Sequence, residues 1–430
     1  MKSKMKRILK QILEHGADKA SLVLETQTTE EFNVIYKRLS FLRSFESSNL
    51  RISAIKNQCI ANCSLNQLDD ASIDAAIDTL MTSFESGTPD PAYDFSSHQK
   101  PQSWKRGKME VDPSLVIKRL NEFIDDMKAK YPQVEYNATL SHVVNDNLHL
   151  NSNEVEFHDI SACYSLILLF SSKVGKKCSS MNYTFMQIKD LDAKLIEVGA
   201  GHIQELIRQN TEQIHTKLIP ASFKGDLLIA PSTAISLLAN FVTGQIGNFP
   251  FISNSCKFPD SIGKQILDAK ISLINATDHE DFAHIQHVTD DGYISKPAVI
   301  IENGILRHYP INLYTANKCG MQRTIGMPTS WLLKSGDSSL NDMISSIKEG
   351  ILLIRQSGDG PNSDGDISFV AKNSYYIKDG KIQFPISETM VSGNLVEWLN
   401  RVKAVSQESF NNGSWQSPYL LISDVEISSK

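Results

Sequence analysis

Long stretches of β-forming residues in the first third of the chain constrain the fold more than any other feature of the sequence. Three of them, bounded by polar turns, are typical of antiparallel strands: residues 20–28, 31–37 and 41–55. In the following segment, 69–84, apolar residues recur every three or four positions, and Asp69 is available as a cap at its start. We therefore expect a helix here that packs against the sheet.

The rest of the first half predicts a linker, two more helices and four more strands. Residues 86–108 contain three prolines, two glycines and a basic run, which indicates an exposed linker rather than a phosphate-binding patch. Asp112 followed by Pro113 is a typical helix start, because aspartate caps the first turn and proline fits the first helical position. The strands are expected at 134–144, 148–151, 155–172 and 178–185, and a long helix at 189–218.

A change in composition around Pro220 marks the expected domain boundary. A chain of 430 residues is long enough for two or three domains at roughly 100–200 residues each. We predict an α+β fold with two domains. The N-terminal domain, residues 1–218, mixes helices with an antiparallel sheet, and the C-terminal domain, residues 219–430, is β-rich with a few helices.

Two turn sequences in the second domain predict tight β-hairpins. Asn-Gly lies within residues 301–306 and Asp-Gly within 377–382, and both dipeptides favour the positive φ angles of a two-residue turn. We also expect a short strand at 226–230, a helix that opens at Ser232 and an amphipathic helix at 338–355.

Composition excludes several classes of function. The chain has 43 Lys and Arg against 49 Asp and Glu, a formal charge of −6, so nucleic acid is not an expected partner. No apolar stretch approaches the roughly 20 residues that cross a membrane. Residues 1–13 are basic and lack the apolar core of a signal peptide, so we expect a surface helix there. The six cysteines are too sparse for a disulfide scaffold, and we expect reduced thiols in a cytoplasmic protein.

The sharpest local pattern is His279-Glu280 followed by His284 and His287. Histidines beside a glutamate could bind zinc and supply a general base. On a regular helix, however, residues five apart lie roughly 140° from each other, whereas the familiar four-residue spacing keeps both histidines on one face. The flanking sequence is loop-like. We interpret the pattern as a polar surface loop and keep a metal site of His279, His284 and His287 as the alternative.

None of the other short motifs supplies a complete set of catalytic or metal-binding residues. Ser261-x-x-Lys264 matches a nucleophile motif at two positions only, and its usual companion motifs are absent from the sequence. Cys59 and Cys63 have no second cysteine pair at metal-ligand spacing, so half-buried strand thiols are expected. The acidic, glycine-rich stretch 358–366 fails the template of a calcium-binding EF-hand loop.

Several segments, taken in order, resemble the TldD/PmbA (TldE) family, whose members have also been described as modulators of DNA gyrase. The segment Pro-Ile-Ser-Glu-Thr-Met-Val-Ser-Gly-Asn-Leu at 385–395, together with 260–267, is most similar to the PmbA branch. The segments that carry the resemblance span nearly the whole chain: 45–52, 86–91, 151–170, 228–238, 260–267, 290–293, 301–306, 376–382, 385–395 and the closing strand to 427.

The resemblance implies a two-subunit cytosolic zinc peptidase that processes or degrades small unfolded peptides. In the TldD-type subunit, His-Glu-x-x-x-His lies on the first helix of the C-terminal domain, and a cysteine near the C-terminus completes the ligands. Here the histidine positions fall on Ala239 and Gly244, the glutamate position on Asn240, and the cysteine position near 414–416. The resemblance therefore implies no metal and no cofactor in this chain, with zinc in a TldD-like partner.

Three hypotheses follow. The leading one is a non-catalytic PmbA/TldE-type subunit that forms a heterodimer with a TldD-like zinc peptidase and helps to enclose unfolded peptide. Loops 387–395 and 358–366 are expected to line the peptide chamber, with Ser392, Gly393 and Asn394 as candidate substrate-binding residues. The second is a stand-alone metal-dependent hydrolase that uses the histidine loop, and the third is a homodimeric peptide-binding protein without catalysis.

Overall fold

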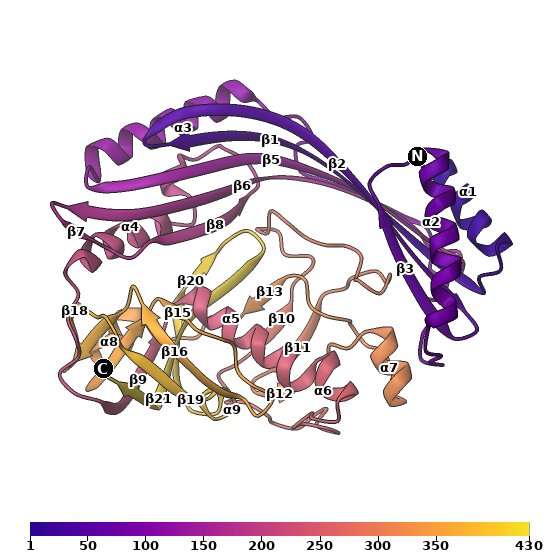
Figure 1. Cartoon of the computed structure of the whole chain (residues 1–430). Coiled ribbons are helices and arrows are strands. Elements are labelled where there is room, and N and C mark those ends of the chain that lie inside the picture. The colour runs from indigo at the N-terminus through magenta and orange to yellow at the C-terminus, as the bar shows by residue number, and fades with distance from the viewer. Residues whose placement is uncertain (430) are drawn as a thin grey trace.

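Two β-sheets dominate the computed structural model, which describes residues 1–429 (Figure 1). The fold is α+β, as predicted. The first sheet has eight strands in the order β3-β2-β1-β5-β6-β4, with β7 and β8 also paired to β6. Its strands are β1 Lys19–Ile35, β2 Arg38–Lys56, β3 Cys59–Leu65, β4 Gln102–Arg106, β5 Val134–Asn151, β6 Glu156–Val174, β7 Lys177–Cys178 and β8 Asn182–Ile188.

The long strands of this sheet are longer than the sequence predicted. The stretches 20–28 and 31–37 form one strand, β1, and 134–144 joins 148–151 in β5. Polar residues interrupt these strands without breaking them, because each is paired on both sides. The sheet curls strongly and arches over the C-terminal part of the chain (Figure 1).

Helices cover only one face of the first sheet, which we call the outer face. α1 and α2 pack on one end of it and α3 and α4 on the other. Their bounds are α1 Lys2–Glu14, α2 Asp70–Ser83, α3 Pro113–Lys130 and α4 His202–Glu212. Both predicted caps are confirmed: the Asp69 carboxylate accepts from the Ser72 N–H at 2.9 Å, and that of Asp112 from the Leu115 N–H at 3.1 Å. The predicted helix at the N-terminus is α1.

Two predictions for the first half are wrong in part. The expected linker 86–108 contains β4, which pairs in parallel with β6, and the Asn151 amide donates to the Ser96 carbonyl at 2.9 Å. Of the expected helix 189–218, only α4 forms as an α-helix. Gly199, Ala200 and Gly201 have positive φ angles, which a right-handed helix does not allow, so the helix begins only at residue 202.

The second sheet has thirteen strands and is mixed, since β9 runs parallel to β14 and β13 to β21. The strands are β9 Phe223–Ile229, β10 Leu273–Asn275, β11 Ala298–Glu302, β12 Ile305–Leu306, β13 Trp331–Leu333, β14 Glu349–Leu353, β15 Arg355–Ser357, β16 Asp366–Lys372, β17 Tyr375–Lys378, β18 Lys381–Pro385, β19 Met390–Asn394, β20 Val402–Asn411 and β21 Trp415–Ser428. The helices are α5 Pro231–Phe241, α6 Asn248–Ile252, α7 Leu313–Cys319, α8 Leu340–Ser345 and α9 Leu395–Leu399. None of the helices in residues 1–429 combines the length and apolarity that a membrane span requires.

Local sequence predicted the turns of this sheet correctly and one of its helices wrongly. Both hairpins form, with Asn303 and Asp379 at φ angles of 48° and 49°. The expected helix 338–355 is instead the short α8 followed by β14. β14 lies between β9 and β17, and this pairing overrides the helical spacing of its apolar residues.

The turn between β20 and β21 joins the two sheets. The Asn412 carbonyl accepts from the Gln187 N–H of β8 at 2.7 Å, and the Gly413 carbonyl accepts from the Ala283 N–H at 2.7 Å and the His284 N–H at 3.0 Å. Gly413 has a φ angle of 91°, and a Cβ atom there would lie 1.9 Å from the Gln187 carbonyl oxygen. This junction therefore requires glycine.

A largely buried ion pair fixes the loop that faces the first sheet. Arg323 binds both carboxylate oxygens of Asp291, at 2.7 and 2.8 Å, and its guanidinium lies 3.9 Å from the centre of the Tyr293 ring. Burial raises the pKa of Asp291, but the hydrogen bonds and charge of Arg323 lower it by more, so its pKa lies below the usual value.

We predict that Gly413→Ala destabilises the protein by about 2 kcal/mol or more, through positive φ and a clash with β8. Gly175→Ala is the matched control, because Gly175 also has positive φ but a Cβ atom there would have no neighbouring atom within 4 Å. The control should cost about 1 kcal/mol. Denaturant unfolding of both variants measures the difference, and equal losses would contradict the steric argument.

We predict that Asp291→Asn destabilises the protein by about 3 kcal/mol, because the buried guanidinium of Arg323 loses its counter-charge. The folded-state pKa of Asp291 is lowered, so the stabilisation from the pair is present above about pH 4 and is lost as the pH falls through the folded pKa. Unfolding measured from pH 7 downward should show a weaker acid dependence in the variant than in the native chain. An unchanged dependence would argue against this assignment.

Candidate functional site

The face of the first sheet opposite the helices, which we call the inner face, carries exposed apolar side chains at one end. Cross-strand pairing places Ile167 beside Phe185 and Leu169 beside Tyr183, and all four are exposed. Their neighbours Leu166, Leu168 and Met186 point to the outer face and are buried. The alternation shows that β6 and β8 present apolar side chains on both faces, whereas helices cover only one.

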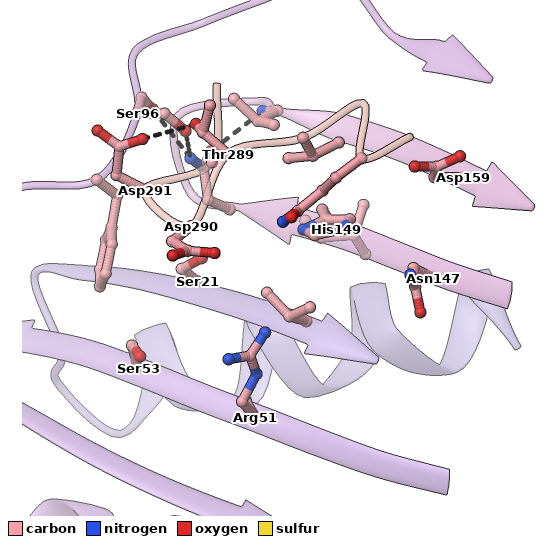
Figure 2. A pocket seen from close by; sticks show the side chains of 18 of the residues that line it. Ser21, Arg51, Ser53, Ser96, Asn147, His149, Asp159, Thr289, Asp290 and Asp291 are labelled. Carbon is pink, nitrogen blue, oxygen red and sulfur yellow. Dashed lines mark hydrogen bonds between the residues drawn. The ribbon is translucent and has the colours of Figure 1, made fainter. Parts of the chain in front are cut away.

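The other end of the inner face is polar and forms a cavity of about 490 Å³, which we call the sheet pocket (Figure 2). Side chains of β1, β2, β5 and β6 form one wall and residues 284–292 another. Polar residues in its lining include Ser21, Arg51, Asn147, His149, Asp159 and Asp290. Burial lowers the pKa of His149 to about 4, so this imidazole is neutral at pH 7. The mixture of charges and hydroxyl groups suits polar ligands.

The predicted histidine loop docks against the first sheet instead of forming a cluster. His287 Nδ1 lies 2.9 Å from Asp159 Oδ1, and the ring stacks on Trp104 with centres 5.1 Å apart. The His279 ring stacks on Phe282, and Arg106 donates to the backbone carbonyl of Phe282. These contacts give the loop a structural explanation.

The side chains around His284 in the described residues form no set of metal ligands. Burial lowers the pKa of His284, and no hydrogen bond joins its ring to another side chain in the described part of the chain. No group of three His, Cys, Asp or Glu residues within 1–429 is arranged to hold a metal ion.

The helix α5 carries the residues that the sequence placed at the family's ligand positions. Ala239 and Asn240 lie near its end, and Gly244 lies in a π-helical turn, Val242–Ile246. A methyl group, an amide and a glycine give no set of side-chain ligands for zinc, which prefers imidazole, thiolate and carboxylate. These residues do not fit a catalytic metal.

Loop 358–366 lies beside the end of α5. The Gln245 amide donates to the Ser363 carbonyl at 3.3 Å, and a Cβ atom at Gly360 would lie 3.7 Å from Asn240 Nδ2. The structure thus brings loop 358–366, which the sequence predicted to line the peptide chamber, next to α5, which carries the family's ligand positions.

Ser392, Gly393 and Asn394 have folding roles. All three lie in β19, which pairs with β16. The Asn394 side chain accepts from the Val396 N–H at 3.1 Å, and its amide donates to Asp366 Oδ1 at 2.9 Å. Asn394 therefore caps α9 and holds the end of loop 358–366, and its predicted contact with substrate remains a prediction.

A second cavity, of about 380 Å³, lies between the edge strand β8 and α5, and we call it the α5 pocket. No sequence pattern indicated it, because its walls come from segments far apart in the chain. Its lining includes Tyr183, Phe185, Ser232, Ser236, Arg355 and Trp415. Trp415 lies in residues 414–416, where the resemblance places the family's cysteine ligand. This segment and α5 therefore line the same pocket.

Arg355 is the charged group of the α5 pocket. Its Nη1 donates to Asn182 Oδ1 at 2.9 Å, and its guanidinium carbon lies 3.8 Å from the centre of the Tyr183 ring. Burial lowers the pKa of Arg355, and no carboxylate of residues 1–429 forms an ion pair with it. No local sequence signal marks this residue, because it simply follows the apolar strand β14.

Comparison with known proteins agrees with the fold. Residues 222–429 match the PmbA/TldA metallopeptidase C-terminal domain. The chain is 23% identical to a metalloprotease PmbA homolog of Haemophilus influenzae, over 96% of this chain and 93% of the relative. It is 29% identical to a zinc metalloprotease TldD homolog of Saccharolobus solfataricus, over 34% of this chain and 35% of the relative.

Solved structures show the same fold over the whole chain. TldE from Thermococcus kodakarensis superposes with a TM-score of 0.85 at 16% identity, covering 99% of this chain and 100% of its own. A candidate modulator of DNA gyrase from Bacteroides thetaiotaomicron superposes with a TM-score of 0.87 at 20% identity, covering 100% of this chain and 99% of its own. The family match over residues 222–429, the relatives named PmbA and TldD and the shared fold agree with the resemblance found in the sequence, and together they support the PmbA/TldD/TldE family for this chain.

Proposed function

We propose that this chain is the non-catalytic, PmbA/TldE-type subunit of a cytoplasmic two-chain zinc metallopeptidase that processes or degrades small unfolded peptides. The observation that carries the proposal is the chemistry of α5. Ala239 and Gly244 have no side-chain donor for a metal, and the amide of Asn240 cannot accept a proton as a general base. Since these residues do not fit zinc, the proposal places zinc in a TldD-like partner.

The inner face supports a role in holding peptide. Unfolded peptides expose apolar side chains, and the exposed residues Ile167, Leu169 and Phe185 offer apolar surface on a rigid sheet. Within the described residues, β8 pairs only with β6 in the sheet. On its other edge the Gln187 N–H donates to the Asn412 carbonyl, whereas residues 183–185 line the α5 pocket. An extended peptide binds such an edge through main-chain hydrogen bonds that do not depend on its sequence.

We predict that peptidase activity requires a partner chain carrying His-Glu-x-x-x-His. Co-expression with such a chain from the same genome should yield a complex with stoichiometric zinc that cleaves unfolded peptides, and this chain alone should yield neither. Zinc analysis by mass spectrometry and a fluorogenic peptide assay measure both. Mutation of the first partner histidine to alanine, as a control, should remove zinc and activity together. Stoichiometric zinc and cleavage by this chain alone would overturn the proposal, and a homodimer that binds peptide but recruits no partner would replace it.

We predict that His284→Ala leaves zinc content unchanged and alters kcat/KM of the co-purified complex by no more than about twofold. His284 lies in the loop that docks on β4 and β6, and no metal-ligand cluster surrounds it in residues 1–429. The same zinc and peptide assays measure the outcome. A joint loss of zinc and turnover would support the histidine loop as a metal site instead.

A further inference from the structure

Arg355 has unused hydrogen-bonding capacity in a partly desolvated place. A guanidinium carries five N–H donors, and only the bond to Asn182 engages this one. Two other arginines with largely buried side chains differ: Arg323 binds Asp291, and Arg119 binds Glu122 and two backbone carbonyls. Arg355 is therefore a half-buried cation whose remaining donors lack an acceptor within residues 1–429.

The rest of the α5 pocket is complementary to an anion. No aspartate or glutamate of residues 1–429 lines it. The other basic side chain among the described lining residues is His202, whose pKa burial lowers to about 4, so the ring is neutral at pH 7. The pocket therefore carries a single positive charge that no neighbouring acid in the described chain neutralises.

Two hydroxyl groups provide additional donors. Ser232 and Ser236 are one helical turn apart on α5, both line the pocket, and no hydrogen bond to another described residue engages either hydroxyl. Gln356, the neighbour of Arg355, also lines the pocket, and its Oε1 is buried without a hydrogen-bond partner among residues 1–429. Oε1 is an acceptor suited to the N–H group of a peptide.

The planar guanidinium is held by two contacts. It lies over the Tyr183 ring, and its Nη1 donates to Asn182 Oδ1. A guanidinium so held presents the parallel N–H pair that matches a carboxylate in two-point contact. The aromatic rings of Phe185 and Trp415 line the same cavity and offer apolar surface to a neighbouring side chain.

We infer that the α5 pocket is a carboxylate-binding subsite in which Arg355, Ser232 and Ser236 hold a carboxylate group of a bound peptide. The identity of the ligand as a peptide rests on the proposed function. The carboxylate comes from the C-terminus of the peptide or from an acidic side chain, and both sources present the same group to Arg355. The subsite sets the position of the peptide along the edge of β8.

Fluorescence anisotropy on the full-length chain tests this inference with three labelled peptides. They are Ala-Ala-Ala-Phe with a free C-terminus, the same peptide as its C-terminal amide, and Ala-Glu-Ala-Phe amide. We expect the free acid to bind at least about tenfold more tightly than the uncharged amide, as a charge-assisted two-point contact requires. Equal binding of the glutamate peptide and the free acid would assign the subsite to acidic side chains, and weak binding of the glutamate peptide would assign it to the C-terminus.

Variants of the pocket connect the preference to its residues. Arg355→Met should remove the preference for the free acid, and Arg355→Lys should retain part of it. Ser236→Ala keeps the guanidinium and its packing, so it should reduce binding of the free acid a few-fold even if Arg355→Met proves unstable. Arg401→Met, a matched surface change at an arginine paired with Glu397, should leave the preference intact.

Three results would overturn the inference: equal affinity of native protein for acid and amide, a preference that survives Arg355→Met, or no binding of either peptide. The measurement uses this chain without zinc and without a partner. A negative binding result would therefore contradict the carboxylate subsite without affecting the co-expression assay. A negative co-expression assay would contradict the proposed function without affecting the measured preference for the free acid.

Discussion

One-sided burial of the long strands is the constraint on which the rest of the structure depends. α1 to α4 cover the outer face of the first sheet, so alternate side chains along much of β1, β5 and β6, and in the last part of β2 from Leu50 on, enter a core. The alternate side chains are left on the inner face, and several contacts join the sheet to the C-terminal part of the chain. The turn at Gly413 is one of them, and Arg106, which donates to the backbone of the histidine loop, is another. Both pockets exist because these contacts hold the two sheets close while leaving space between them.

Sequence predicted the fold well where the determinant is local. Asp69 and Asp112 cap helices, and Asn303 and Asp379 turn hairpins, because each of these effects involves only a few neighbouring residues. Prediction failed where pairing with a distant strand decides the outcome. The apolar spacing of residues 338–355 suits a helix, but β14 lies between two other strands, and burial on both sides favours the extended backbone.

The candidate site was less predictable than the fold for the same reason. His279, His284 and His287 attract attention because they are close in sequence, yet the structure uses the loop for docking, through the contact of His287 with Asp159 and Trp104. Arg355 attracts none, because its partners Asn182 and Tyr183 lie more than 170 residues earlier in the chain. Arg355 stands out because no carboxylate among the described residues neutralises its charge, and this can be seen only once its neighbours in the fold are known.

On the proposed function, the chemistry of α5 and that of the neighbouring pocket divide the work between two chains. A subunit without a metal ligand or a general base cannot stabilise the transition state of peptide hydrolysis directly. It can still raise the effective concentration of a substrate and fix its orientation. On the proposed function, a carboxylate held by Arg355 fixes the register of the peptide along β8, and the rigid inner face limits its other motions. Removing such an anchor would alter which bond of the peptide reaches the catalytic zinc of the partner, and would alter the chemistry of that zinc much less.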